Sequence, residues 1–183
     1  MQRSSLDIAE DLVVLRASGG CVESFSTLTD RWHPRLVRHA TRYLRDRAAA
    51  DDVVQEAWLA ISRGIRRLDD PARFGPWAYR IVTNKCADHV RSESAQRRVA
   101  LASTPSDNGA VSDNESGGAL RRAMAVMPAE RRTLLALHYL EGLSVAQLAE
   151  VFAVPMGTIK SRLFHARAEL KSIVERDNDE EHR

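Results

Sequence analysis

The sequence that decides the fold is LSVAQLAEVFAVPMGTIKSRLFHAR, residues 143–167. Ser144 suits a helix N-cap, and Leu148 and Val151 follow at a spacing that places both on one side of a short helix. Pro155 cannot continue that helix, but its fixed backbone angle suits the start of the next one. The stretch therefore predicts two helices joined by a tight corner, which is a helix-turn-helix.

Apolar side chains recur at steps of three and four along the second of these helices. They predict one buried stripe made of Met156, Ile159, Leu163, Ala166 and Leu170. Arg167 points back toward this stripe, so we expect it to form an internal salt bridge.

The opposite side of that helix carries short hydroxyls, an arginine and a histidine, namely Thr158, Ser161, Arg162 and His165. Such groups suit the reading of base edges in a DNA major groove, and Lys160 beside them suits a phosphate contact. The alternative is an ordinary amphipathic hairpin with a solvated polar face. Corner, stripe and polar face all agree with DNA reading, which favours that interpretation.

The composition and charge of the 183 residues fit one or two small domains with few aromatic side chains, a balance that favours helices. Residues 31–98 hold 15 basic and 8 acidic side chains, and residues 120–176 hold 9 and 5. The segments 1–30, 99–119 and 177–183 are each net acidic. Two basic blocks separated by acidic segments indicate two modules that bind polyanions.

Several classes of protein are disfavoured by what the sequence lacks. No apolar run approaches the roughly 18 residues of a membrane span, and no secretory signal is visible, so we expect a cytoplasmic protein without membrane insertion. Cys21 and Cys86 belong to no CxxC pair, which argues for two small core residues. Cys86 and His89 make at most half of a metal site. We expect no metal and no cofactor, and we find no constellation typical of an enzyme.

Two helices are expected at the N-terminal end. The first covers residues 7–17, with Ile8, Leu12 and Leu15 toward the core, and a Gly-Gly pair ends it. The second runs from Cys21 towards Leu44 and is bent or restarted at Pro34. Its outer face carries arginines, a pattern that is often only solubilising: Arg31, Arg35, Arg38, Arg42, Arg45 and Arg47.

The next helix begins near Ala49 in this interpretation. Asp51 and Asp52 then fall in its first turn, where the helix dipole favours negative charge, so helix capping is one reading. The other reading is that Asp52, Gln55 and Glu56 form an acidic and polar patch amid basic surroundings, which is a plausible site for protein docking.

Residues 69–75 predict a loop, and a helix follows with its buried stripe at Phe74, Ala78, Ile81 and Val82. On the opposite side of this helix lie Arg80, Asn84 and Arg91, with Asp88 beside them. Such a helix can hold unstacked single-stranded bases while its arginines bind phosphate. Trp77 fits either a stacking role or, as is more common at helical spacing, the core.

Residues 99–119 are rich in Ser, Asp, Asn and Gly and contain no Lys or Arg, so we expect a flexible linker. Two helices follow, over residues 120–127 and 128–141, and the polar tail 177–183 is expected to fray. The second of these helices supplies leucines to the core: Leu134, Leu135, Leu137 and Leu140.

Three segments, taken in this order, carry a family resemblance: ADDVVQEAWLAI (residues 50–61), RFGPWAYRIVTNKCADHVR (73–91) and VPMGTIKSRLFHARAEL (154–170). The chain resembles a bacterial RNA polymerase sigma factor of the extracytoplasmic-function (ECF) group of the sigma-70 family. The likeness covers most of residues 25–174.

The resemblance implies an all-α fold of two small helical domains. Residues 1–98 would be the sigma-2 domain, 99–119 a linker, 120–176 the sigma-4 domain with the helix-turn-helix, and 177–183 a polar tail. In the family this linker threads through the polymerase, but a simple tether between the domains fits the sequence equally well. The implied partners are core RNA polymerase, through its beta-prime clamp helices and beta subunit, promoter DNA, and an anti-sigma factor.

The resemblance also implies roles for the residues at matching positions. The clamp helices of polymerase would contact Asp52, Gln55 and Glu56. The melted minus-10 element would be captured by residues 69–75 together with Arg80, Asn84, Asp88 and Arg91. The duplex minus-35 element would be read by Thr158, Lys160, Ser161, Arg162 and His165.

Two positions depart from the family pattern. Ala153 stands where many relatives have Gly, which costs about 1 kcal/mol if the corner needs a left-handed backbone. His165 stands where relatives often have Arg, which weakens a phosphate contact. Two other functions stay open at this point: a stand-alone helix-turn-helix regulator that binds DNA without polymerase, and an enzyme whose site the sequence does not reveal.

Overall fold

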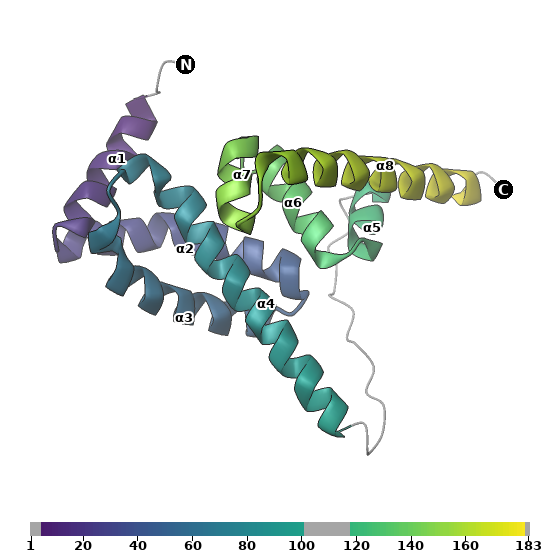
Figure 1. Cartoon of the computed structure of the whole chain (residues 1–183), viewed down its shortest axis with the longest axis horizontal. Coiled ribbons are helices and arrows are strands. Elements are labelled where there is room, and N and C mark those ends of the chain that lie inside the picture. Colours follow the sequence, from purple (N-terminus) through teal and green to yellow (C-terminus); the bar gives the residue numbers. More distant parts are fainter. Residues whose placement is uncertain (1–4, 101–117, 182–183) are drawn as a thin grey trace. The chain divides into compact units, whose positions relative to one another are not determined.

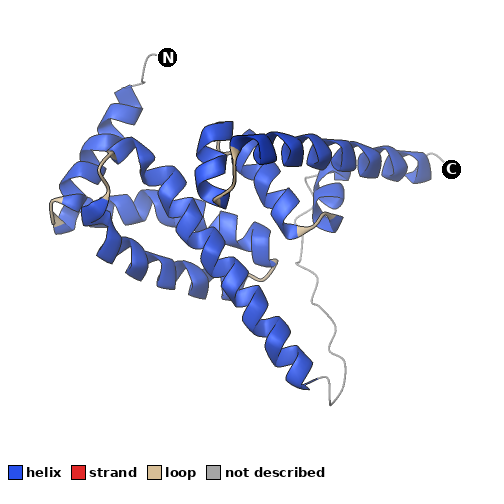
Figure 2. Ribbon diagram, viewed as in Figure 1, coloured by secondary structure: helices blue, strands red, loops and turns tan. Residues whose placement is uncertain are grey.

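The computed structural model describes residues 5–100 and 118–181, which divide into two compact units, described separately below (Figures 1 and 2). The first unit contains α1 (Ser5–Ser18), α2 (Val22–Leu44), α3 (Arg47–Gly64), the short 3-10 turns η1 (Ile65–Arg67) and η2 (Pro71–Arg73), and α4 (Phe74–Ala100). The second contains α5 (Gly118–Val126), α6 (Ala129–Tyr139), α7 (Val145–Phe152) and α8 (Met156–Glu181). No strand occurs in these two ranges, and the predicted all-α fold of two helical units is confirmed.

Trp32 joins three helices of the first unit. Its indole Nε1 on α2 donates to Glu10 Oε1 on α1 at 3.0 Å. The edges of its ring meet Phe74 and Tyr79 of α4, at centroid distances of 5.2 and 5.7 Å. Trp32 is 5% exposed, so the core is built around a large aromatic whose polar atom is satisfied.

A buried hydrogen-bond chain adds a second link between α2 and α4. The Thr83 hydroxyl donates to the Tyr79 carbonyl at 2.7 Å, so its oxygen is left to accept from His39 Nε2 at 2.9 Å. Burial lowers the pKa of His39 to about 3, with the positive charge of Arg42 as a second cause. His39 is therefore a neutral core residue that fixes the register of the two helices.

The predicted orientation of the N-terminal helix was wrong. Val14 and Ala17 face the core of the first unit, whereas the side chains expected there are more than half exposed: Ile8, Leu12 and Leu15. The sequence of α1 is apolar on two sides, so periodicity alone does not choose between them. The Glu10–Trp32 hydrogen bond holds α1 against α2 with Val14 and Ala17 buried.

Several predicted boundaries differ from the observed helices. α2 passes through Pro34 as one helix, and the predicted loop 69–75 contains η2, whose N-cap Asp70 accepts a hydrogen bond from the Ala72 N–H. α8 continues to Glu181 through most of the predicted tail. Helical residues also occupy both ends of the range 99–119, and its residues 101–117 lie outside the described part of the chain.

α8 is the central helix of the second unit, in contact with α5, α6 and α7. Its buried stripe consists of Ile159, Leu163 and Ala166, continues through half-buried Leu170 and ends at Ile173. Met156 was expected in this stripe but is 55% exposed, since it lies about 60° around the helix from Ile159, at the uncovered end. Leu140 was also placed wrongly in the core: it follows the last residue of α6 and is 64% exposed.

The helix-turn-helix forms as predicted from its sequence. Ser144 and Gln147 make a reciprocal capping box at the start of α7: Gln147 N–H donates to Ser144 Oγ at 3.2 Å, and Ser144 N–H donates to Gln147 Oε1 at 2.9 Å. α7 ends at Ala153, whose φ of 52° is left-handed. This residue carries the strain expected of a position where glycine fits better.

Replacing Gly75 by Ala should destabilise the first unit. An added Cβ would lie 2.8 Å from Cη2 of Trp32, whose ring is held by Glu10, Phe74 and Tyr79 and cannot give way easily. We expect a loss of about 1–3 kcal/mol in the free energy of unfolding, measured by urea titration followed by Trp fluorescence. Gly157→Ala is the matched control, because Gly157 is also the second residue of a helix and has nothing within 4 Å of its Cβ position. Equal effects of the two changes would contradict the tight packing around Trp32.

Replacing Ala153 by Gly should stabilise the second unit. The change relieves a left-handed alanine, and the gain is partly offset by the greater freedom of glycine in the unfolded chain, so we expect about 0.5–1 kcal/mol. Thermal unfolding followed by circular dichroism measures it. Ala168→Gly, at an exposed position inside α8, should instead destabilise by about 1 kcal/mol. A loss of stability in both variants would show that the corner is not strained.

Candidate nucleic-acid interface

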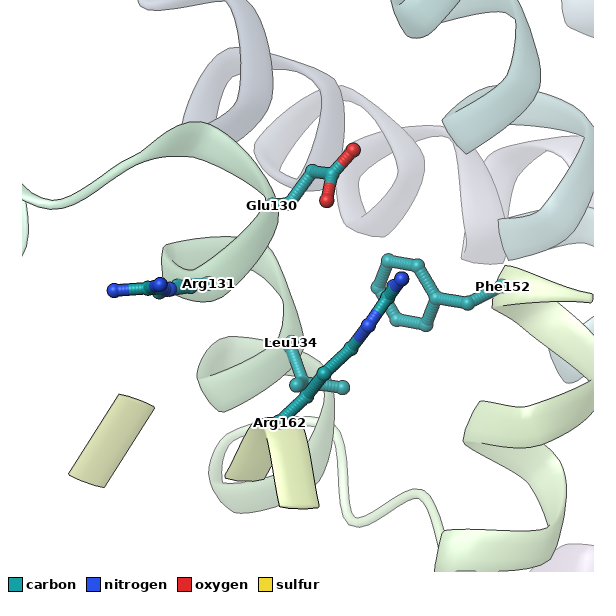
Figure 3. Close-up of a pocket in the computed structure, with 5 residues that line it drawn as sticks. All are labelled: Glu130, Arg131, Leu134, Phe152 and Arg162. Atoms are coloured by element: carbon teal, nitrogen blue, oxygen red, sulfur yellow. The ribbon is translucent and has the colours of Figure 1, made fainter. Parts of the chain in front are cut away.

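The first turns of α8 present a mixed polar surface. Lys160, Ser161, Arg162 and His165 are exposed as predicted, and Thr158 is half-buried. Arg162 lies at the flank of this surface, at a hollow of about 190 Å³ that it lines with Glu130, Arg131, Leu134 and Phe152. Figure 3 shows Arg162 reaching toward the Phe152 ring, whereas Arg131 points away. By helical position, Ser161 and His165 lie nearer to the centre of this face than Arg162 does.

Phe164 belongs to the same face and was missed by the sequence reasoning. It is 62% exposed, and its ring meets the imidazole of His165 edge to face at 5.5 Å. An exposed aromatic ring beside polar groups suits an apolar contact such as that with a thymine methyl. The signal was available in the sequence, because Phe164 lies outside the apolar stripe of the helix.

Arg167 does not form the internal salt bridge that was expected. It is exposed, and its Nη1 lies 3.4 Å from the hydroxyl of Tyr139 at the end of α6. The ion pair between α6 and α8 that the structure does show joins Arg131 to Glu169 at 2.6 Å. Helix positions alone did not reveal which arginine meets an acidic side chain of another helix.

The outer side of α4 carries the four polar residues predicted to lie together. Arg80, Asn84, Asp88 and Arg91 are all exposed and recur at steps of four, four and three, so they share one face. Asp88 forms an ion pair with Arg91. The face is therefore basic at its Arg80 end and locally neutralised at its far end.

Trp77 is held in the packing between α3 and α4. A Cβ at Gly64 would lie 2.8 Å from Cζ2 of its ring, and Phe74 lies 6.1 Å away between ring centroids. The ring is half-buried against these neighbours. This contact supports the structural interpretation of Trp77 over a stacking role.

The acidic patch of α3 is not a helix cap. Asp46 is the N-cap, accepting from the N–H groups of Ala48 and Ala49 at 2.8 and 3.2 Å, so α3 begins earlier than predicted. Asp51 instead pairs with Arg47 at 3.0 Å, so the capping interpretation was wrong.

The exposed face of α3 is formed by Asp52, Gln55, Glu56 and Leu59. Leu59 was not singled out by the sequence reasoning, and it is 58% exposed one turn beyond Gln55. Glu56 also pairs with Lys85 of α4 at 2.8 Å. An apolar side chain within an acidic, polar face is a common composition for a protein-docking surface.

The cysteines and histidines form no metal centre among the side chains that the structure describes. Cys86 is fully buried, and burial raises the pKa of its thiol to about 12. Cys21 is only half-buried, contrary to expectation, and its Sγ lies 3.2 Å from both Glu23 Oε2 and Ser24 Oγ. His89 lies 3.8 Å from Glu93 and not in a ligand set. Within the described ranges no helix is long and apolar enough to cross a membrane.

Each of the two units matches a known protein family. Residues 28–96 match the family model of sigma-70 region 2, and residues 117–170 match that of sigma-70 region 4. The chain is 32% identical over 151 residues to SigM of Mycobacterium tuberculosis, an ECF RNA polymerase sigma factor, covering 82% of this chain and 77% of SigM. It is 28% identical to RfaY, a probable RNA polymerase sigma factor of Xanthomonas campestris, over 94% of this chain. The chain spans only 46% of RfaY.

Two solved structures share the fold. The sigma factor RpoE in complex with the anti-sigma factor NepR from Bartonella quintana gives a TM-score of 0.72 at 20% identity, covering 84% of this chain and 98% of that one. CnrH, solved in complex with the cytosolic domain of CnrY, gives 0.66 at 24% identity, covering 92% and 99%. With both sigma-70 regions matched in order and SigM similar over most of both chains, this chain belongs to the ECF group of sigma-70-family RNA polymerase sigma factors.

Proposed function

We propose that the chain binds core RNA polymerase, recognises the minus-35 and minus-10 elements of promoters, and assists their melting so that transcription of a specific set of genes begins. The observation that carries this proposal is the presence of three separate exposed faces, on α3, α4 and α8, within the two regions that match the family. A protein that only binds duplex DNA needs the α8 face alone.

The α3 face would dock on the polymerase. Its exposed Asp52, Gln55 and Glu56 supply charge and hydrogen-bond acceptors, and Leu59 supplies an apolar contact at the C-terminal end of the face. These groups would meet a basic and apolar surface, such as the clamp helices of the beta-prime subunit. Contacts of the second unit with the beta subunit belong to the same proposal.

The two DNA faces would divide the work of promoter recognition. On α8, Thr158, Ser161, Arg162 and His165 would read base edges of the duplex minus-35 element, and Lys160 would contact phosphate. On α4, the minus-10 element would be held as separated bases by Arg80, Asn84, Asp88 and Arg91, together with residues 69–75. Opening the duplex costs unstacking energy, which contacts to extruded bases offset.

Control by an anti-sigma factor is part of the proposal, since the two solved structures described above are complexes, one of them with a protein named as an anti-sigma factor. We also propose that the chain acts in the cytoplasm, where polymerase is, and that it catalyses no reaction itself. The stand-alone regulator is disfavoured, because the match to region 2 covers the whole helical core around Trp32 and not only the helix-turn-helix.

The first test combines the purified chain with core polymerase and a library of genomic promoter fragments. We expect defined RNA start sites that are absent with core enzyme alone.

The double variant Asp52→Lys/Glu56→Lys should bind core polymerase at least tenfold more weakly, since reversed charge at a complementary interface loses about 1.4 kcal/mol or more of binding free energy. Asp30→Lys/Glu175→Lys reverses two other exposed acidic residues and should bind core normally. Unchanged core affinity of the first variant would remove the α3 face from docking.

Substitutions on the two proposed DNA-binding faces should impair different steps of initiation. Asn84→Ala should reduce permanganate reactivity of minus-10 thymines while leaving closed-complex formation within about twofold, because its partner is a base exposed only after melting. Arg162→Ala should weaken closed complexes by about 5- to 150-fold on some promoters and not others, as expected for lost base readout of about 1–3 kcal/mol. Equal losses on every promoter for Arg162→Ala, or normal opening by Asn84→Ala, would contradict the assigned roles.

A further inference from the structure

The arginines of α2 form a continuous track that the proposed function does not use. We call Arg31, Arg35, Arg38, Arg42 and Arg45 the arginine track. The first four recur at steps of four, three and four residues, which keeps them on one side of α2, and they span about 17 Å at roughly 1.5 Å per residue. Arg45 directly follows the last residue of α2 and has a left-handed backbone with a φ of 62°.

The track is exposed and largely free of acidic neighbours. Arg31, Arg38 and Arg45 are exposed, and among the side chains that the structure describes none of the three has an ion-pair partner. Of the carboxylates next to the track, Asp46 caps α3 and Asp51 pairs with Arg47, while Asp30 is exposed directly before Arg31. From Arg31 to the end of α2 the sequence contains no Asp or Glu. Like charges at this spacing repel one another, so the track destabilises the isolated helix.

The track borders the face of α4 that is proposed to hold the minus-10 strand. His39 of α2 contacts Thr83 of α4, and Arg35 and Arg42 are the neighbours of His39 one turn before and one turn after it. The guanidinium of Arg35 also lies over the ring of Trp32, 5.1 Å from its centroid. Both arginines therefore stand on the side of α2 that meets α4.

On α4, the residues next to these contacts point outward. Asn84 follows Thr83, and Arg80 follows Tyr79, the residue that meets the Trp32 ring. The hydrogen bond from His39 to Thr83 and the edge contact between the Trp32 and Tyr79 rings join α2 directly to α4. The track and the α4 face thus keep a fixed relation.

The composition of the track indicates a polyanion and not a folded protein as its ligand. Protein interfaces centre on apolar or aromatic side chains. Among the described residues, the large exposed apolar side chains of the first unit are Ile8, Leu12, Leu15, Val22, Leu59 and Val90, none of them on α2 between Glu23 and Leu44. Arginine forks match phosphate oxygens, and a B-form strand presents a phosphate about every 3.4 Å. The helical part of the track is long enough to follow about five nucleotides.

We propose that the arginine track binds the phosphodiester backbone of promoter DNA, independently of sequence, and continues the path of the strand that α4 holds. This proposal rests on the proposed function. The shared chemistry is a row of phosphates, supplied either by duplex DNA beside the minus-10 element or by the separated strand.

The test uses the full chain bound to core polymerase and the triple variant Arg31→Gln/Arg38→Gln/Arg45→Gln. Arg35 and Arg42 are kept, since Arg35 stacks on Trp32 and Arg42 has an intramolecular partner. Promoter affinity is measured over a range of KCl concentrations. We expect the slope of log K against log salt to fall by about 2–3, with at least a tenfold loss of affinity near physiological salt. The loss should be equal on promoters with different minus-10 sequences.

Two matched variants control for net charge and for folding. Arg122→Gln/Lys171→Gln/Arg176→Gln removes the same charge from the second unit and should leave the slope unchanged. Arg31→Lys/Arg38→Lys/Arg45→Lys keeps the charge and should restore most of the slope. Circular dichroism melting of the Gln variant should show no loss of stability, because the three side chains have no ion-pair partner among the described residues and the change removes like-charge repulsion.

Each outcome bears on one proposal. If the wild-type holoenzyme shows no promoter-specific binding, the proposed function fails. If it does and the Gln variant behaves like its charge control, the arginine track proposal is overturned. Weaker binding of the Gln variant to core polymerase without DNA would also overturn it, in favour of an acidic protein surface. A loss seen on fully duplex fragments assigns the phosphates to the duplex, and a loss confined to pre-melted templates assigns them to the single strand; either supports the proposal.

Discussion

The side chain of Trp32 constrains the rest of the first unit. Its indole donates a hydrogen bond to Glu10 of α1 and makes edge contacts with the Phe74 and Tyr79 rings of α4. Gly75, which has no Cβ, allows the backbone of α4 to approach the indole ring. Once these contacts are made, the rotation of α4 about its own axis is fixed. The outward direction of Arg80 and Asn84 then follows from packing and needs no contact of their own.

The second unit uses a different constraint for the same purpose. α7 and α8 are set by the Ser144 capping box, the left-handed corner at Ala153 and the burial of Ile159. The strained backbone at Ala153 is maintained because Leu148 of α7 and Ile159 of α8 are fully buried on either side of it. In each unit, packing thus orients one helix, α4 or α8, so that its polar face points away from the core.

Charge is arranged by face in the first unit. Acidic and polar groups occupy the outside of α3, basic groups line α2, and Glu56 and Lys85 meet where α3 borders α4. An exposed pair of this kind contributes little stability, about 0–1 kcal/mol. Its significance is that one residue of the proposed docking face touches the helix proposed to hold separated bases.

The sequence by itself determined the all-α fold, the helix-turn-helix, the left-handed corner residue and the three polar faces. These depend on local signals: helical periodicity, an N-cap, a proline, and the ordered family segments. The tertiary structure alone decided which side of α1 is buried, that Asp46 caps α3, and that Arg131 of α6 pairs with Glu169 of α8 while Arg167 lies near the Tyr139 hydroxyl. The reason is physical: where a helix is apolar on two sides or carries several charges, its partners in other helices choose among equally periodic alternatives, and those partners are distant in sequence.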